Sequence, residues 1–505
     1  MKIETWKKPA IILLFVSLSV LTRWMSLCVG ILDLDEAGHI IGSWQLLEGK
    51  LLYTDFVDNK PPLVYVYYAL AQILFGRGMF SVHLLTALVT VPATAWGVYA
   101  FFDRRSTGIY AALIFLFYSA SFLAHDMLAA NAEILMILPG IWALTLVNTW
   151  EKGMQVKRIA ASSFLIGVGV LCKHQIVFWL PAVATAISIE CLRRKLYAKW
   201  FAFGFTAVFS FLLPLTAAYA VFRYFGGAEA FFHWTVTNNI SYAANPISLR
   251  EAIGRAVSTL VPFVLVTSPL WFYGYRSSRL QESGYRSVLV LCLILFSVPA
   301  VFIGFRFFPH YFIQFYVPLS LAAAPYVSAL FSEGKAHRFT VYSVSLFVLC
   351  NIVNAVLYFG DTNVYRERDP VYRKVAQVLK RSPCYTGATL FVWGYAPMFY
   401  YYAELTPASR FALLSHGGLT GYISGNLQII RSQQNSDGRE SWRLFLEDLD
   451  KNRCTYILDT APAAIYRWDR YPMKDYPLLN DYVAKNFELI TTVDQVAIYQ
   501  RLHCH

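Results

Sequence analysis

The chain has 505 residues, of which 57% are hydrophobic, 17% aromatic and only 15% charged. This composition excludes an ordinary soluble domain, in which about 25% of residues are charged, and predicts an integral membrane protein. The formal net charge of +12 at pH 7 falls largely in short loops between apolar stretches. It therefore indicates membrane topology, and no nucleic-acid-binding pattern accompanies it.

Apolar stretches of spanning length recur about eleven times along the chain. They cover approximately residues 9–30, 80–102, 107–124, 132–149, 159–172, 176–191, 200–222, 252–273, 287–305, 311–331 and 339–359. Lys and Arg cluster in every second loop, and positively charged short loops are retained in the cytoplasm. The sequence therefore predicts about eleven transmembrane helices, a cytoplasmic N-terminus and an extracytoplasmic region after about residue 360.

Two further apolar segments, between the first two spans, are predicted to be helices that lie on the outer membrane surface. Residues 61–76 begin with prolines suited to a helix N-terminus, are short for a span and carry three tyrosines typical of the interface. Residues 36–49 place Ile40, Trp44 and Leu47 on one helical face and end at a glycine.

The region after the last span reads as alternating helix and strand, which predicts a small α/β domain. The predicted domains are thus a transmembrane domain over residues 1–359 and an extracytoplasmic domain over 360–505. The outer elements are helices at Pro370–Arg381 and Glu440–Asn452, strands at Leu390–Trp393, Tyr456–Asp459, Phe487–Thr492 and Val496–Gln500, and a loop at residues 432–438.

Three of the eight cysteines, Cys384, Cys454 and Cys504, fall in this outer domain. The other five lie in or beside spans and are expected to pack as small apolar residues. Because Cys384 and Cys454 each precede a predicted strand, they are predicted to form a disulfide if the compartment is oxidising.

Polar residues at the span ends gather on the predicted outer side of the membrane. Charged groups beside hydrocarbon-length segments are expensive and usually functional, so an outward-opening polar cavity is predicted. Carboxylates that can take a hydroxyl proton and cations that can stabilise a departing phosphate suit glycosyl transfer from a lipid-linked phosphosugar. The residues are Asp33, Asp35, Glu36, His39, Asp58, Lys60, His125, Asp126, Asn131, Glu133, Lys173, His174, Gln175, His233, Arg306 and His310.

Several motifs resemble those of the polyprenyl-phosphate-sugar-dependent glycosyltransferases of the GT-C fold. The resemblance is closest to the branch that contains the protein O-mannosyltransferases and the lipid A aminoarabinose transferase. It covers nearly the whole chain, although only the first-loop motif is specific by itself. The motifs are Asp35-Glu36, Lys60-Pro61-Pro62-Leu63 before an apolar helix that ends at Phe75-Gly76, Lys173-His174-Gln175, His310-Tyr311 and Val392-Trp393-Gly394-Tyr395-Ala396-Pro397.

The resemblance implies an inverting hexosyl or pentosyl transfer from an undecaprenyl- or dolichyl-phosphate sugar, on the outer face of a bacterial inner membrane. An Asp matching Asp35 is the base in the mannosyltransferases, and basic residues bind the carrier phosphate. The chain lacks the large soluble insert of the eukaryotic mannosyltransferases. It also has Asn59 where the aminoarabinose branch carries Glu, which argues against a metal site there. The acceptor could be lipid A, a polysaccharide, a glycolipid or a protein.

The catalytic candidates are Asp35, Glu36 and Asp33. Asp35 is the first candidate for the base, and its alternative role is a helix N-cap that contributes roughly 1 kcal/mol. Asp33 lies two positions earlier, on the same face of an extended chain, and is the second candidate. Glu36 diverges from Asp35 on a helix and is expected to orient a partner such as His39.

A second set of residues is assigned to the donor phosphate or substrate. Arg306 and Lys173 suit phosphate oxygens, although an interfacial cation can equally contact ordinary headgroups. The carboxylate of Glu133 could instead satisfy amides at a helix N-terminus. The set is Lys60, Asp58, Lys173, His174, Gln175, Arg306, His310, Tyr311, His125 and Glu133.

No cofactor follows with certainty from the sequence. His125, Asp126 and Glu133 could supply ligands to a divalent metal, but their spacing matches no recognised signature. The segment 231–247 is a candidate for a loop that closes over the site and excludes water.

Two other classes of function remain open at this point. Charges among many helices also describe a transporter of a lipid or anionic solute, although that reading predicts internal repeats and polar residues that reach both faces. A non-catalytic assembly subunit would recruit a partner through residues 360–505, but it leaves the acids of the first loop unexplained.

Overall fold

The computed structural model describes residues 2–122, 124–150, 154–244, 247–280, 284–359, 369–414, 419 and 436–503. The chain forms two compact units. Unit 1 consists of Met1–Asp33, Lys60–Val221 and Ser248–Ala355, and unit 2 of Leu34–Asn59, Phe222–Ile247 and Val356–His505. The boundary predicted near residue 360 lies close to Val356, where the last segment of unit 2 begins. Two earlier segments, Leu34–Asn59 and Phe222–Ile247, also belong to unit 2.

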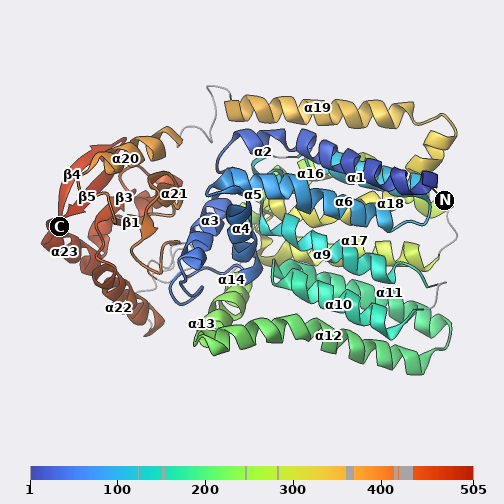
Figure 1. Cartoon of the computed structure of the whole chain (residues 1–505), viewed down its shortest axis with the longest axis horizontal. Coiled ribbons are helices and arrows are strands. Elements are labelled where there is room, and N and C mark those ends of the chain that lie inside the picture. Colours follow the sequence, from blue (N-terminus) through green and yellow to red (C-terminus); the bar gives the residue numbers. More distant parts are fainter. Residues whose placement is uncertain are drawn as a thin grey trace. The chain divides into compact units, whose positions relative to one another are not determined.

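Unit 1 is a bundle of helices, and a helix occupies the position of each predicted span (Figure 1). The helices are α1 (Lys2–Thr22), α2 (Trp24–Cys28), α4 (Pro62–Phe75), α5 (Met79–Leu85), α6 (Val91–Ala100), α7 (Arg105–Tyr118), α8 (Ala124–Met127), α9 (Ala132–Val147), α10 (Val156–Val170), α11 (Trp179–Arg193), α12 (Tyr197–Tyr224), α15 (Leu249–Arg255), α16 (Val261–Leu280), α17 (Tyr285–Phe302), α18 (Ile313–Ser332) and α19 (His337–Phe359). Short π-helical or 3-10 segments join several of them: η1 (Thr86–Thr90), η2 (His174–Phe178), η4 (Ala256–Leu260), η5 (Ile303–Phe305) and η6 (Pro309–Phe312).

Seven helical segments in the described residues are long and apolar enough to cross a membrane. Four shorter apolar helices, among them α4 (Pro62–Phe75), accompany them. The predicted multi-pass helical fold is therefore confirmed, while the count of eleven spans stays a prediction. The seven segments are Met79–Ala100, His174–Arg193, Tyr197–Tyr224, Leu249–Leu280, Tyr285–Phe305, Pro309–Ser332 and His337–Val356.

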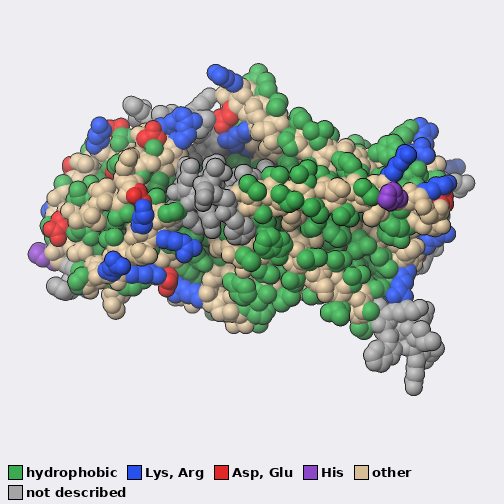
Figure 2. Space-filling view, turned by 90° about the horizontal axis from the view of Figure 1, so that it is seen from above, with side chains coloured by type: hydrophobic (Ala, Val, Ile, Leu, Met, Phe, Trp, Pro, Cys, Tyr) green, Lys and Arg blue, Asp and Glu red, His purple; other side chains and the backbone are tan. Residues whose placement is uncertain are grey.

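The outer surface of this bundle is apolar, as expected of helices that face lipid. Phe201 and Phe205 on α12 are 70% and 77% exposed, and α19 presents Val344 and Val348 in the same way. Figure 2 shows a broad apolar band over the face of the bundle that carries α19, with Lys and Arg gathered at one end of the bundle. Inside the bundle, α16 and α7 pack against α18, while α9 packs against α10.

Unit 2 contains the predicted α/β sheet. Five strands lie in the order β2-β1-β3-β5-β4, with β1 parallel to β2 and β3, and β5 antiparallel to β3 and β4. The strands are β1 (Thr389–Trp393), β2 (Thr406–Pro407), β3 (Tyr456–Asp459), β4 (Phe487–Val493) and β5 (Val496–Arg501), and the helices around them are α20 (Asp369–Arg381), α21 (Met398–Ala403), α22 (Ser436–Lys451) and α23 (Pro477–Asn486). Pro370–Arg381, Glu440–Asn452 and the four predicted strands are confirmed as elements, whereas α21, α23 and β2 have no counterpart among the predictions.

The first loop after α1 and α2 is part of unit 2. It carries α3 (Leu34–Leu47), whose Trp44 ring stacks on Tyr401 with ring centroids 5.9 Å apart. Farther along, the Val57 amide donates to the carbonyl of Arg410 at 2.9 Å. On the predicted apolar face of α3, Ile40 and Trp44 are therefore buried and not free to lie on a membrane, whereas Leu47 is 47% exposed.

Two segments of unit 2 that the sequence predicts to be loops contain helix in the structure. Residues 231–244 are not a loop, because they continue α13 (Ala228–Phe232) into η3 (His233–Thr237) and α14 (Asn238–Ala244). Of the predicted loop 432–438, residues 432–435 lie outside the described residues, and the rest begin α22.

The predicted Cys384–Cys454 disulfide is wrong. Cys454 is a free thiol, although Cys384 is disulfide-bonded. Cys454 is fully buried in the core behind the sheet, where its thiol donates to the carbonyl of Tyr456, while Cys384 lies half-buried after α20. Cys504 lies outside the described residues.

Candidate functional site

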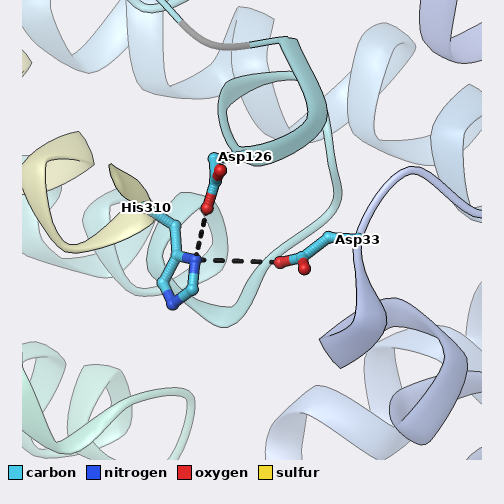
Figure 3. Close-up of side chains that lie close together, drawn as sticks. All are labelled: Asp33, Asp126 and His310. Carbon is cyan, nitrogen blue, oxygen red and sulfur yellow. Dashed lines mark hydrogen bonds and ion pairs between the residues drawn. The ribbon is translucent and has the colours of Figure 1, made fainter. Parts of the chain in front are cut away.

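Two carboxylates and one imidazole meet at the centre of the candidate site in unit 1. His310 Nδ1 lies 2.7 Å from Asp126 Oδ1 and 3.7 Å from Asp33 Oδ2 (Figure 3). The three side chains come from distant parts of the chain: the end of the first loop segment of unit 1, the short helix α8 and the turn η6. His310 and Asp126 are almost entirely buried, so this contact is made away from bulk water and is strong.

Two neighbours complete this group. Asn131, the residue before α9, donates through Nδ2 to Asp33 Oδ2 at 2.9 Å. His125 Nε2 lies 2.6 Å from the other oxygen of Asp126. Burial alone would disfavour the charged form of Asp126, but the hydrogen bonds with His125 and His310 outweigh it and hold the pKa of this carboxyl well below its usual range. Burial lowers the pKa of His125, and the adjacent Asp126 carboxylate reverses this and raises it overall.

A second ion pair lies in the same unit. Glu133, in the first turn of α9, is fully buried and forms an ion pair with Lys173, with Oε1 and Nζ 3.0 Å apart. The Lys173 ammonium also lies 5.6 Å from the centre of the Tyr311 ring. Because Tyr311 follows His310 directly, the two groups are joined through η6. The electrostatic interaction between His310 and Glu133 links them further.

Lys60 belongs to the same region. Its charge acts on both Glu133 and His174. The backbone explains why: the Leu63 amide, at the start of α4, donates to the carbonyl of Leu171 at 3.0 Å, which ties this segment to the loop that carries Lys173 and His174. Gln175, the next residue, is buried within η2. Three cationic or titratable residues from two loops therefore share one neighbourhood.

Arg306 is held in an unusual backbone segment between η5 and η6. Its side chain is fully buried, and its carbonyl accepts a hydrogen bond from Arg255 at 3.4 Å. Gly304, Phe305 and Phe307 all have left-handed φ values, of 65°, 54° and 47°. Non-glycine residues in that region cost about 1–3 kcal/mol each and persist where the surroundings enforce them. The sequence gives no hint of this strain beyond the glycine.

The other predicted residues, Asp35, Glu36 and Asp58, belong to unit 2. Asp35 and Glu36 lie in the first turn of α3, Asp35 half-buried and Glu36 fully buried. Asp58 Oδ1 accepts from the Asn59 amide at 2.6 Å. Asp35 follows Asp33 by two residues, so chain connectivity is what relates it to the cluster in unit 1.

The acid and imidazole group also fits a metal ion. The ligand atoms of Asp33, Asp126 and His310 lie within 4.8 Å of one another, and two carboxylate oxygens with one imidazole nitrogen are ordinary ligands of divalent transition metals. His310 Nδ1 is the atom that faces both carboxylates. A metal would therefore take the place of the proton between them.

The structure gives three residues parts in the site that sequence reasoning did not assign to them. Asp126, expected only as a polar residue and a possible metal ligand, faces both His125 and His310. Asn131 and Arg255 act through hydrogen bonds to Asp33 and to the Arg306 backbone. Only a predicted contact between the two loops that carry Asp126 and His310 could have found them.

Chemically, the site combines a buried acid and imidazole group with a neighbouring set of cations. The first can hold or move a proton, since His310 Nδ1 stands between two carboxylates. The second, around Lys173 and Lys60, can hold an anion, since ammonium groups in a dry surrounding attract phosphate oxygens strongly.

The chain resembles known proteins in part of its sequence and in its fold. Residues 59–217 match the family model described as Dolichyl-phosphate-mannose-protein mannosyltransferase. ArnT from Cupriavidus metallidurans bound to undecaprenyl phosphate aligns with a TM-score of 0.61 and 12% identity, over 96% of this chain and 97% of ArnT. Its apo state aligns with a TM-score of 0.57 and 13% identity, over 98% of both chains. No relative was found among curated protein sequences. The chain therefore has the fold of ArnT, which is the GT-C fold expected from its motifs. Its residues 59–217 match the mannosyltransferase family model.

Proposed function

We propose that this protein is a glycosyltransferase that moves a sugar from a polyprenyl-phosphate donor to an acceptor hydroxyl at the outer face of a bacterial inner membrane. The observation that carries the proposal is the buried set of charges in unit 1, in which Lys173 and Glu133 lie beside the His310 and Asp126 pair. The ArnT fold supports it, since ArnT was solved bound to undecaprenyl phosphate.

The donor phosphate is assigned to the cations of unit 1. Lys173 and Lys60 hold its oxygens, with Arg306 and His310 as further donors of hydrogen bonds. As the bond between the anomeric carbon and the phosphate oxygen breaks, negative charge grows on that oxygen. Cations fixed in a dry site stabilise this charge without reorganising, which lowers the barrier. His174, Gln175 and Tyr311 complete the surroundings of the carrier phosphate.

The acceptor is activated by a carboxylate. Asp35 takes the proton of the acceptor hydroxyl, whose oxygen attacks the anomeric carbon while the polyprenyl phosphate leaves, so the product has inverted configuration. Asp33, which accepts a hydrogen bond from Asn131, is the second candidate for the base and is compared with Asp35 by substitution. Glu36 and Asp58 orient the segment that bears Asp35. The hydroxyl belongs to a lipid, a glycan or a protein.

A divalent cation is a further part of the proposal. It would be held by Asp33, Asp126 and His310, where its positive charge would stabilise negative charge on a bound phosphate. Incubating the purified protein with a strong chelator, followed by metal analysis and re-addition of Mn²⁺ or Zn²⁺, tests this assignment. Full activity in protein that carries less than about a tenth of an equivalent of metal would rule it out.

The topology completes the proposal. The N-terminus lies in the cytoplasm and unit 2 lies outside, because Lys and Arg concentrate in every second loop and such loops are retained in the cytoplasm. Cysteine labelling with a membrane-impermeant reagent in intact cells tests it, using single introduced cysteines at exposed sites of unit 2 and in the loop after α11.

The direct test is transfer in vitro. Purified protein in lipid nanodiscs is given undecaprenyl-phosphate sugars of the hexose and pentose classes together with extracted envelope glycolipids. Release of undecaprenyl phosphate and the mass of the product are then followed. Asp35→Asn should lose at least about a hundredfold in rate, while Asp55→Asn, an exposed acid in the same segment of unit 2, should not.

Two outcomes would overturn parts of the proposal. A strong loss in Asp33→Asn with full activity in Asp35→Asn would move the base to Asp33. Uptake of a lipid or anionic solute into proteoliposomes, without any glycosylated product, would favour the transporter reading instead.

A further inference from the structure

The segment between α8 and α9 is held by side chains from distant parts of unit 1. Four successive backbone carbonyls in this segment each accept a hydrogen bond from another helix or helix junction, and none of the four bonds is a helical one. The bonds run from Arg23 Nη1 to Met127 O (3.1 Å), from Arg23 Nη2 to Leu128 O (2.7 Å) and Ala129 O (3.4 Å), and from the Tyr68 hydroxyl to Ala130 O (3.1 Å).

Both donor side chains are buried. Arg23 is 1% exposed and Tyr68 is 0% exposed. A buried guanidinium is costly unless its donors are used, and each hydrogen bond to a charged group contributes about 1.5–3 kcal/mol. The planar fork of Arg also presents its donors in a fixed geometry. The carbonyls and the guanidinium therefore constrain one another.

The backbone of Arg23 is also held by hydrogen bonds. Arg23 lies at the junction of α1 and α2, where its amide donates to Ser19 O at 3.0 Å and its carbonyl accepts from the Ser26 hydroxyl at 2.7 Å. The guanidinium therefore projects from a defined point of the first helix. From the same junction the chain continues to Asp33, so one segment supplies both the clamp and a carboxylate of the site.

The two ends of the clamped segment carry site residues. Asp126 precedes it and contacts His310 Nδ1 at 2.7 Å. Asn131 follows it and donates to Asp33 Oδ2 at 2.9 Å, and also to the carbonyl of Asp126 at 3.3 Å. Any shift of the four carbonyls would move both side chains relative to His310 and Asp33.

We propose that Arg23, assisted by Tyr68, is a positioning residue that clamps Met127–Ala130 and thereby sets the places of Asp126 and Asn131 in the site. The guanidinium touches neither donor nor acceptor, and it acts through the backbone. Its role in transfer rests on the proposed glycosyltransferase function, whereas the clamp itself does not.

The clamp is tested by hydrogen exchange on the full-length protein in nanodiscs. Arg23→Met should raise amide exchange in a peptide covering residues 124–131 by about tenfold or more, since it removes three charged hydrogen bonds. Arg23→Lys should show a smaller rise because an ammonium keeps its charge and part of its donors. Tyr68→Phe, which keeps the ring and removes one hydroxyl, is the variant that is safest for folding.

Two matched controls separate the clamp from general loosening of the bundle. Tyr316→Phe removes a hydroxyl that is equally buried but makes no hydrogen bond with the described residues. Arg286→Met removes a guanidinium that pairs with Asp103 at 2.8 Å. Neither should change exchange over residues 124–131. Unchanged exchange in both Arg23→Met and Tyr68→Phe would overturn the clamp, whatever the enzyme's activity.

Kinetics test the positioning role. Arg23→Met should lower kcat by about 10- to 100-fold, as expected for a misplaced catalytic group, with KM for the donor within about twofold of the wild-type value. Arg23→Lys should recover part of kcat. Combined with Asp126→Asn, the Arg23 change should add little further loss, because both disturb the same group.

The outcomes separate the two proposals. If the wild-type protein transfers no sugar, the proposed function fails and hydrogen exchange alone decides the clamp. If the wild-type protein is active and Arg23→Met raises exchange yet keeps full kcat, the positioning role is overturned. Additive losses in the Arg23 and Asp126 double variant would also overturn it, since they indicate independent, purely structural effects.

Discussion

The two units hold their acidic residues by different means. In unit 1, Asp126 and Glu133 are kept in place by ion pairs with His310 and Lys173 inside an apolar bundle. In unit 2, Asp35 is carried by α3, a helix fixed through aromatic stacking and backbone pairing with the sheet domain. A single change of charge should therefore act strongly in unit 1. In unit 2, the acids depend on the integrity of a fold that is assembled from three parts of the chain.

The largest expected effect comes from the shared imidazole of unit 1. His310→Ala removes a partner that Asp33 and Asp126 share, so transfer should fall by about 100- to 1,000-fold. The initial rate of polyprenyl phosphate release measures it. His337→Ala, an exposed histidine at the start of α19, is the control and should retain the wild-type rate. A His310→Ala rate within twofold of wild type would contradict the assignment of this residue.

The next largest effect is expected at the buried ion pair of Glu133 and Lys173, where one charge without the other should destabilise unit 1. Glu133→Gln leaves the Lys173 ammonium buried without its counter-charge, which should cost about 3–5 kcal/mol of unfolding free energy. Adding Lys173→Met should recover most of that stability, because two neutral side chains then face each other. Thermal unfolding in detergent measures both variants.

The same pair also separates stability from function. The double variant should bind undecaprenyl phosphate more weakly than wild type, since Lys173 is a proposed phosphate ligand. Wild-type stability in Glu133→Gln would show that the pair is not desolvated. Wild-type lipid binding in the double variant would remove Lys173 from the donor site.

Unit 2 contains an ion pair of its own, beside the backbone contact that joins the first loop to the sheet domain. Arg410 forms a bidentate ion pair with Asp448, and its carbonyl accepts from the Val57 amide. Arg410→Ala should destabilise unit 2 by about 2–3 kcal/mol, because it leaves the buried Asp448 carboxylate unpaired. It should also raise hydrogen exchange around Val57. Arg443→Ala, which breaks an exposed ion pair with Glu440, should do neither.

The smallest expected effect is a pH dependence confined to unit 2. Burial raises the pKa of Asp459, at the end of β3, to about 6. Because the folded state binds this proton more tightly than the unfolded chain, the contribution to stability is full below about pH 4. It is lost as pH rises through about 6. Asp459→Asn should flatten the Tm profile between these values. A profile identical to that of the wild type would contradict this cause.

The sequence was sufficient for the fold class because its signals are local. Apolar stretches predict helices wherever they occur, and all the predicted span positions are helical. The strand at Tyr456–Asp459 was equally clear, since its first three residues form a short apolar run. By contrast α21, which is built from consecutive aromatics, has neither a helical nor a strand period.

The site was predictable only in part, since it depends on contacts between distant segments. Chemistry and position singled out Lys173 and His310, and the structure brings both into one region through Tyr311. Nothing local in the sequence pairs Glu133 with Lys173 or Asp126 with His310. The disulfide prediction failed for the same reason, because position before a strand does not tell which way the Cys454 side chain points.

The membership of the first loop in unit 2 has a consequence for biosynthesis. Glu48 accepts a hydrogen bond from the hydroxyl of Thr406, which is translated 358 residues later. At synthesis rates of about 5–20 residues per second, the loop waits roughly 20–70 s after leaving the ribosome before its packing partner exists. During that interval Trp44 lacks the Tyr401 ring on which it stacks in the folded chain. A membrane surface or a chaperone outside the membrane has to shelter this helix until synthesis is complete.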